Sequence, residues 1–301
     1  MNGERAVGRR SKRTNADKKD TMLRVRAMSL ALVVVLMIVG IAKTPYARQD
    51  KAGVVAGITG SVNSVNADNL RSTVLHLENY GNRSTWEKQW ETARWAAAEL
   101  EKYGLDATLQ TYEHDKKQWP NVIATRRGTK HAEEIIMPIA HLDSISDAPH
   151  REGPGADDDG SGVAAVLEIA RILQLVPVER TVMFCLFSNE ERGAHGSKYF
   201  ARHAKEQKLD IRAVINLDVL GYNAPKAFAP FDAIRAHYTV KHKIKAFYRM
   251  SRNFMLSVFS NQDRVKIAGR EENALLVKMV SQRFQQYADI GVKEITGGGC
   301  A

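Results

Sequence analysis

The sequence predicts an α/β fold with three layers, in which helices cover both faces of a mainly parallel, mixed sheet. From residue 66 onward, short apolar segments alternate with amphipathic ones, as expected when strands and helices follow each other along the chain. Polar and acidic residues follow several of the apolar segments, and open α/β sheets bind ligands beyond the carboxyl ends of their strands. With 301 residues, 44% of them apolar, the chain is long enough for one large domain with extensions.

The N-terminal residues are expected to lie outside this domain. Residues 1–42 form a basic leader that ends in an apolar run, 27–42. A run of about sixteen residues is short for a membrane span and suits the core of a signal peptide. We expect either a cleaved signal peptide or an uncleaved membrane anchor, and both export the domain to the periplasm or the extracellular space. Residues 43–62 are polar and small and predict a linker, so the folded domain is expected over 63–301.

Spacing and capping residues predict the helices. Leu70, Val74 and Leu77 share one face of a first helix over 66–80. The sequence Ser84-Thr-Trp-Glu87 is a capping box that begins a second helix, and Gly104 ends it. Amphipathic patterns predict further helices over 161–175, 196–207 and 270–290.

Alternation and short apolar runs predict the strands. Residues 107–112 alternate, and buried strands are expected over 121–124 and 134–140. Residues 180–187 predict a central strand that contains the core thiol of Cys185, and 211–217 predict the next strand. The segment 221–267 is less regular and basic, and the pattern assigns no strand to it.

The formal charge of +10 does not indicate a nucleic-acid partner. Residues 1–27 contain nine Lys or Arg against three Asp or Glu, so this tail supplies about +6 of the total. The rest of the chain is only mildly basic, which requires no polyanionic partner.

Four short segments carry the residue types that bind metal ions. They contain His141 and Asp143, the successive acids 157–159, the pair Glu190 and Glu191, and Asp218. Most of them follow an expected strand, so their side chains are expected to meet at one edge of the sheet. One imidazole and several carboxylates suit a divalent metal, most simply a pair of zinc ions.

Other interpretations of these segments are weaker. Each segment alone also fits a solvated charged loop, and we expect Asp159 to serve as a helix N-cap. A calcium-binding EF-hand loop fails because Gly155 and Val166 occupy its first and last ligand positions. A serine nucleophile fails because Ser161 lacks the Gly-x-Ser-x-Gly frame. The combination of four such segments favours the metal site.

The segments from His141, Pro154, Phe187 and Asn216 resemble those of the co-catalytic zinc aminopeptidase family. That family includes bacterial leucyl aminopeptidases, glutamate carboxypeptidase and the glutaminyl cyclases. The segments 79–84 and 121–124 are also similar to its N-terminal part, so the resemblance covers roughly residues 66–300. It implies the zinc-peptidase (phosphorylase/hydrolase-like) architecture and two Zn²⁺ ions in the site.

The resemblance implies a role for each candidate residue. His141 and Asp218 are expected to bind one zinc, Asp157 to bridge both ions, and Glu191 to bind the second. A cis peptide bond is expected between Asp157 and Asp158.

Two further residues are expected to serve catalysis. Glu190 is the expected general base, which takes a proton from the attacking water and passes it to the leaving amine. Asp143 is expected to support the site by orienting the imidazole.

The resemblance also implies a later histidine ligand. The chain ends just after Gly297-Gly-Gly-Cys300, a turn that precedes this ligand in the family. We therefore expect the catalytic domain to lack its C-terminal part, the second zinc site to be incomplete, and this chain to be weakly active or inactive. His195, His237 and His242 are conceivable but poorly placed replacements.

The function expected from the sequence is that of an exported zinc metallopeptidase, most simply an aminopeptidase with a peptide substrate. The alternatives are a glutaminyl cyclase-like acyltransferase on the same scaffold and a non-catalytic ectodomain. Membrane contact is expected only through the N-terminal apolar segment, and no nucleic acid is expected to bind.

Overall fold

The computed structural model describes residues 60–146, 153–221, 255–261 and 264–269, the backbone of 291–296 and five helical positions between 274 and 282. The expected leader, its apolar run and most of the expected linker lie outside these residues. Among the described residues, no helix has both the length and the apolar character that crossing a membrane requires.

The strands form one eight-stranded mixed sheet in the order β1-β2-β4-β3-β5-β6-β7-β8. Neighbouring strands are parallel in the pairs β3–β4, β3–β5, β5–β6 and β7–β8, and antiparallel in the other three. The strands are β1 Asp106–His114, β2 Lys117–Arg126, β3 His131–His141, β4 Arg180–Phe187, β5 Asp210–Leu217, β6 Met255–Asn261, β7 Arg264–Gly269 and β8 Gly291–Thr296. The predicted mainly parallel, mixed sheet is confirmed.

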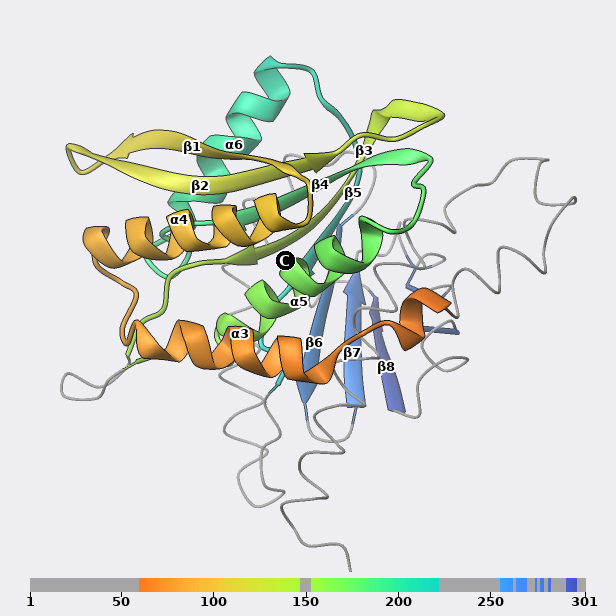
Figure 1. The fold of residues 1–301 in the computed structure, drawn as a ribbon, viewed down its shortest axis with the longest axis horizontal. Coiled ribbons are helices and arrows are strands. Elements are labelled where there is room, and N and C mark those ends of the chain that lie inside the picture. Colours follow the sequence, from red (N-terminus) through yellow and green to blue (C-terminus); the bar gives the residue numbers. More distant parts are fainter. Residues whose placement is uncertain are drawn as a thin grey trace, which may run out of the picture.

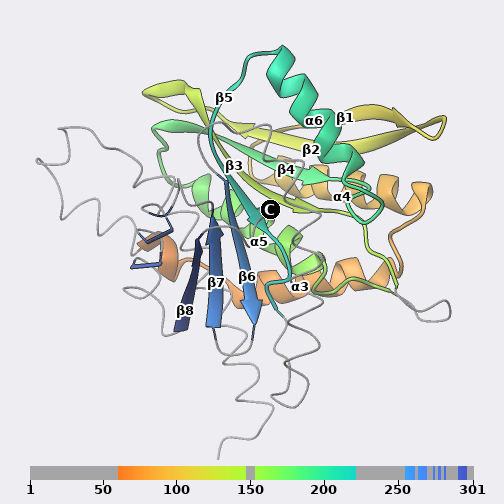
Figure 2. The ribbon, with the colours of Figure 1, turned by 180° about the vertical axis from the view of Figure 1, so that it is seen from behind.

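Helices cover both faces of this sheet. Three of them lie on one face, and α6 lies on the opposite face (Figures 1 and 2). The helices are α3 Ala67–Asn79, α4 Trp86–Lys102, α5 Gly160–Leu173 and α6 His195–Glu206. This arrangement gives the three layers that the alternating sequence pattern predicts.

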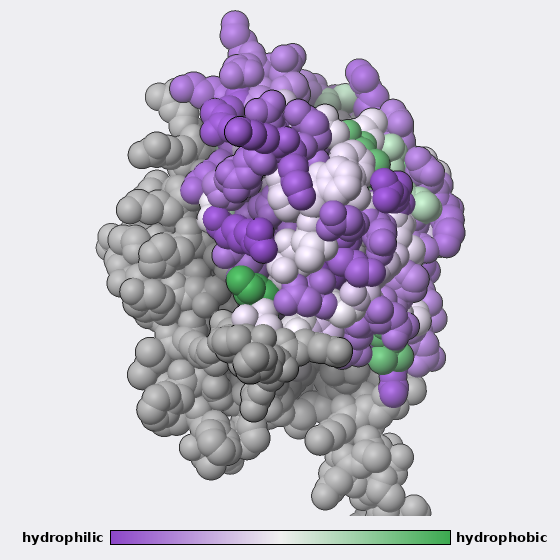
Figure 3. All heavy atoms as spheres, turned by 90° about the vertical axis from the view of Figure 1, so that its left-hand side faces the viewer, coloured by the Kyte–Doolittle hydropathy of each residue, from purple (hydrophilic) through white to green (hydrophobic). Residues whose placement is uncertain are grey.

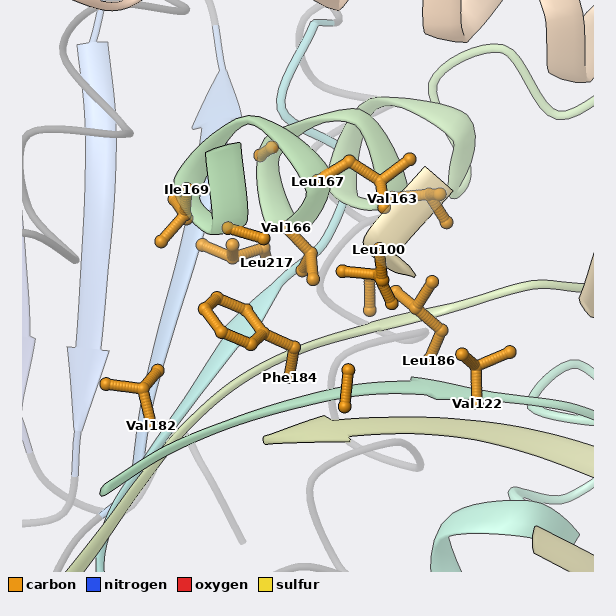
Figure 4. Packing of buried hydrophobic residues seen from close by; sticks show 14 of the residues in the cluster. Leu100, Val122, Val163, Val166, Leu167, Ile169, Val182, Phe184, Leu186 and Leu217 are labelled. Atoms are coloured by element: carbon orange, nitrogen blue, oxygen red, sulfur yellow. The ribbon is translucent and has the colours of Figure 1, made fainter. Parts of the chain in front are cut away.

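The main core lies between the sheet and helices α3, α4 and α5. Phe184 and Leu186 of β4 point toward Val163 and Val166 of α5 (Figure 4), and all four side chains are fully buried. Burying a side chain of this kind contributes roughly 1.5–3 kcal/mol. The core therefore fixes α5 over the central strands, with its N-terminus at their carboxyl ends.

A second core fills the space between the sheet and α6. Alternate residues of the same strands point into it, such as Met137 of β3 and Phe187 of β4. Phe187 packs against Phe200 of α6 with ring centroids 5.5 Å apart. The free thiol of Cys185 is buried in the same cluster, as predicted.

The predicted elements match the structure within a few residues, with three differences. The N-cap of α4 is Thr85, whose hydroxyl accepts from Lys88 N, rather than Ser84. Strand β6 and most of β7 lie in the segment 221–267, to which the sequence pattern assigned no strand, and β8 was not predicted either. Finally, the predicted helix over 270–290 falls partly outside the described residues, although its described positions are helical.

The surface is mainly hydrophilic on the face shown in Figure 3, where only small apolar patches interrupt it. Among the described residues, the exposed large apolar side chains are Leu75, Ile145 and Leu175, which are far apart in the sequence.

Candidate metal centre

The sheet brings three of the predicted segments to one edge. Strands β4, β3 and β5 are parallel neighbours, so their carboxyl ends lie together. His141 is the last residue of β3, the pair 190–191 follows β4, and Asp218 follows β5. The acids 157–159 reach the same edge because they directly precede α5. The predicted convergence is therefore found.

His141 is oriented as a metal-binding imidazole. Its Nδ1 lies 3.0 Å from the backbone oxygen of Asp143, and because a carbonyl only accepts, Nδ1 carries the proton. Nε2 then presents its lone pair to the site, where it lies 2.9 Å from Oδ1 of Asp158. Metal-binding histidines commonly hold their second nitrogen in this way. The imidazole is 3% exposed, so its direction is set by the fold.

Two groups of possible ligand atoms share this imidazole. The first joins His141, Asp158 and Glu191, and the second joins His141, Asp159 and Asp218. Within each group the ligand atoms lie within 4.8 Å of one another. One imidazole nitrogen with carboxylate oxygens is a donor set that suits zinc. The residues present therefore fit a zinc ion.

Asp159 belongs to the second group but already has two backbone partners. Its Oδ1 accepts from Gly162 N at 3.0 Å and its Oδ2 accepts from His141 N at 3.0 Å. Asp159 is the N-cap of α5, which confirms the prediction for this residue. Burial raises the pKa of its carboxyl well above the ordinary value, and the charges of Asp218 and Asp158 act in the same direction.

Asp157, the expected bridging ligand, points elsewhere. Its Oδ1 accepts from Gly221 N at 2.6 Å and from the Ser161 hydroxyl at 3.0 Å. The pKa of Asp157 is raised to about 6, mainly by burial; the two hydrogen bonds oppose this shift, and the charges of Asp158 and Asp218 add to it. Asp157 belongs to neither group of possible ligands. We therefore propose Asp158, rather than Asp157, for the bridging role.

The cis peptide bond is also displaced by one residue from its expected place. It joins Asp158 to Asp159, not Asp157 to Asp158.

Asp143 supports the site through the backbone of the neighbouring acids. Its Oδ1 accepts from Glu190 N at 2.9 Å, and its Oδ2 accepts from Glu191 N at 3.1 Å. The imidazole of His141 is held by the backbone oxygen of Asp143, while the carboxylate lies 3.5 Å from Nδ1. The predicted supporting residue is thus in place, and it orients the acidic pair as well as the imidazole.

Glu190 faces the same imidazole nitrogen. Its Oε2 lies 3.9 Å from Nε2 of His141, and its side chain is 12% exposed. The carboxylate is therefore beside the candidate ligands and within reach of solvent.

Arg83 is a buried cation behind the site that sequence reasoning missed. Its guanidinium donates to backbone oxygens in three separate parts of the chain, which are those of Leu77, Leu142, Pro154 and Gly155. Burial lowers the pKa of Arg83, although the charges of Asp143, Asp159 and Asp158 oppose this shift. A single arginine between two helices gives no sequence signal for such a role.

Of the three conceivable replacement ligands, the structure describes His195, which lies outside the site. His195 stacks on His114 with ring centroids 3.7 Å apart, and its Nε2 lies 3.0 Å from the backbone oxygen of Arg192. Among the described residues, it belongs to no group of possible ligands. His237 and His242 lie outside those residues.

Comparison with known proteins shows a chain similar to zinc metallopeptidases. The profile of peptidase family M28 matches residues 121–271, half of the chain. A probable zinc metalloprotease of Leptosphaeria maculans is 29% identical over 187 residues, which cover 54% of this chain and 43% of that protein. Aminopeptidase YwaD of Bacillus subtilis is 34% identical over 125 residues, 40% of this chain and 26% of that protein.

A solved structure supports the fold alone. LapB from Legionella pneumophila superposes with a TM-score of 0.56 at 21% identity, covering 85% of this chain and 61% of that one. The chain spans about two fifths of the length of the curated zinc metalloproteases that it matches, for which the matched shares are 43%, 41% and 38%.

Proposed function

This chain belongs to peptidase family M28, and on that premise we propose that it is the catalytic part of an exported zinc metallopeptidase that removes N-terminal residues from peptides. The observation that carries the proposal is the meeting of His141 Nε2, Asp158 and Glu191 at one edge of the sheet, with Glu190 beside them. The names of the relatives support zinc as the metal and aminopeptidase action as the reaction.

The ligands we propose for zinc are His141, Asp158, Glu191 and Asp218. A zinc ion held by these residues would supply Lewis-acid polarisation of the scissile carbonyl and a lower pKa for a neighbouring water. Asp143 keeps the imidazole and the acidic pair in their positions through three hydrogen bonds. Arg83 holds the two loops that carry Asp143 and Asp158, because it donates to backbone oxygens in both.

Glu190 is the proposed general base. Its carboxylate accepts a proton from the attacking water as the water oxygen bonds to the scissile carbon. The same proton then passes to the leaving nitrogen as the C–N bond breaks, so Glu190 is regenerated as a carboxylate. The position of the carboxylate beside His141 Nε2 supports this role.

The test is to compare the full-length protein with its Glu190→Gln variant. We expect both to bind zinc equally, and the variant to hydrolyse amino-acid amides about 10²–10⁴-fold more slowly, the range typical of a lost general base. Zinc content by elemental analysis and turnover of an aminoacyl anilide measure the two properties. Undiminished turnover in the variant contradicts the assignment, and cyclisation of N-terminal glutamine without amide hydrolysis contradicts the reaction class.

Export is supported by the basic leader and the apolar run over 27–42. Cell fractionation tests it, since recovery of the native protein only from the cytoplasm contradicts export.

A further inference from the structure

Three successive backbone N–H groups hold the turn that carries the two glutamates. Each of these donors bonds to a side-chain oxygen from another part of the chain. Asn189 N donates to Oε1 of Gln89 at 3.0 Å. Glu190 N and Glu191 N donate to the two oxygens of Asp143 at 2.9 and 3.1 Å. The backbone of the turn is thus fixed at two points, one at Asp143 and the other at Gln89 of α4.

Gln89 makes a two-point contact with Asn189. In addition to the backbone bond, its Nε2 donates to Oδ1 of Asn189 at 3.2 Å. Both side chains are fully buried. The side-chain nitrogen of Asn189 also donates to the Tyr112 hydroxyl at 3.0 Å, so the turn is held from a second direction.

The backbone conformation of Asn189 explains why the turn needs hydrogen bonds from other parts of the chain. Its φ is +53°, in the left-handed region, which residues other than glycine adopt uncommonly, although asparagine does so more often than most. Asn189 is the residue immediately before Glu190, so its dihedral angles set the direction in which the following carboxylates leave the sheet. Removing the contact to Gln89 leaves a buried N–H group without its acceptor, and the turn must move to satisfy it.

We propose that Gln89 is a positioning residue for the reaction: it fixes the Asn189–Glu191 turn and thereby places the carboxylates of Glu190 and Glu191. This inference rests on the proposed function, because the two carboxylates serve there as base and ligand. Gln89 is fully buried and its printed partners are Asn189 and Ser84, so its effect on the carboxylates is transmitted through the backbone of the turn. It also lies before residue 121, where the family profile begins to match.

The experiment replaces Gln89 by methionine, which keeps the length of the side chain and removes both hydrogen bonds to the turn, together with the long one from its Nε2 to Ser84 O at 3.5 Å. We expect kcat for an aminoacyl anilide to fall roughly 10–100-fold, the range seen when partners of ligands are lost, with KM changed less than about threefold. In the metal-free protein we expect faster hydrogen exchange at the amides of 189–191, measured by mass spectrometry.

Thr92→Val is the matched control. Thr92 is equally buried on the same helix, and its hydroxyl donates to Lys88 O at 2.8 Å, within α4. We expect this variant to lose stability while kcat and exchange in the turn stay at the wild-type values. An equal loss of kcat in the control, or a normal kcat with normal exchange in Gln89→Met, overturns the proposal.

Gln89→Glu is a second variant for the case in which Gln89→Met does not fold. It keeps an oxygen that accepts from Asn189 N and loses the amide donor, so we expect kcat and exchange between those of wild type and Gln89→Met. The side chain of Gln89→Thr is too short to reach the turn. If kcat and hydrogen exchange in this variant equal those of wild type, the proposal is overturned in the same way.

If the wild type hydrolyses no amide, the proposed function fails, whereas the exchange rates still decide the role of Gln89.

Discussion

Three adjacent aspartates at the start of α5 have three different roles, although their chemistry is identical. Asp157 accepts from Gly221 N, Asp158 faces His141, and Asp159 caps the helix. The role of each is set by the direction of its side chain, because a carboxylate serves as ligand, anchor or cap according to the donor it meets. Carboxylates at such short spacing repel one another, so a bound cation would stabilise the group as a whole.

This division of roles predicts opposite results for two matched variants. Asp158→Asn replaces an anionic oxygen that faces the imidazole, and we expect zinc affinity to fall roughly 100-fold. Asp157→Asn keeps an amide oxygen that accepts from Gly221 N and Ser161, and it removes a carboxyl whose ionisation burial already disfavours. We expect its zinc affinity to stay within about threefold of wild type. Competition with a chromogenic chelator measures both, and the reverse order of affinities contradicts our placement of the bridging carboxylate.

The residue types of the candidate site could be predicted from sequence, but the directions in which their side chains point could be predicted less well. His141, Glu191 and Asp218 follow apolar strands, so their meeting is a consequence of parallel topology. The choice between Asp157 and Asp158 depends on backbone dihedral angles that neighbouring identical residues do not reveal. Gln89 was unpredictable for a different reason, since its partner is 100 residues away.

At the level of elements, an ion-pair group joins the three central strands at the end opposite the site. Glu134 of β3 accepts from Arg180 of β4 and pairs with Arg212 of β5, with the closest oxygen of Glu134 2.9 Å from the Arg212 guanidinium. Burial alone raises the pKa of Glu134, but the hydrogen bond and charge of Arg180 and the charge of Arg212 outweigh it, so the pKa is lowered from 4.5.

The lowered pKa of Glu134 predicts a pH dependence of stability. In the unfolded chain the carboxyl titrates near its ordinary value of 4.5, so the pairing contributes fully above that pH. The contribution is lost as the pH falls below 4.5 and through the lower pKa of the folded state. We expect Glu134→Gln to reduce the free energy of unfolding at neutral pH and to lessen its decline with acid. Urea unfolding at several pH values measures this.

The exposed neighbour Glu133 offers the control, because Glu133→Gln removes one acidic charge from the same strand. The role of the ion pairs is contradicted if the free energy of unfolding declines equally with acid in wild type and Glu134→Gln. It is also contradicted if Glu133→Gln changes this decline as much as Glu134→Gln does.

Elements with strong periodic patterns were predictable, and those with short or polar patterns were not. Gly104 adopts φ +71° at the end of α4, so the glycine stop is confirmed. The β1–β2 hairpin turns at Asp115 and Lys116, both with positive φ; aspartate is common in such turns, but lysine is not. Strands β6 and β7 are seven and six residues long, and β6 interrupts its apolar residues with Ser257 and Ser260.

For the whole molecule, the proposed zinc site joins elements that are distant in the chain. Its ligands come from the ends of β3, β4 and β5 and from the residues before α5, so a bound ion connects the sheet to the helical layer. Without the ion, several carboxylates face one another at low exposure. Binding to the folded state alone stabilises a protein according to the ratio of free metal to Kd, about 2.7 kcal/mol at a hundredfold excess.

Removal of zinc is therefore expected to lower the melting temperature of the zinc-loaded protein by about 5–10 °C, given roughly 2–4 °C per kcal/mol for a domain of this size. A chelator added before thermal unfolding measures the shift, and the same chelator saturated with zinc is the control for effects unrelated to the metal. Glu190→Gln should show the full shift, because we propose Glu190 as a base and not as a ligand. Asp158→Asn should show a smaller shift, because it binds zinc less tightly at the same concentration. Equal melting temperatures with free and saturated chelator contradict a zinc site that links the layers, and an unchanged shift in Asp158→Asn contradicts the ligand that we assign.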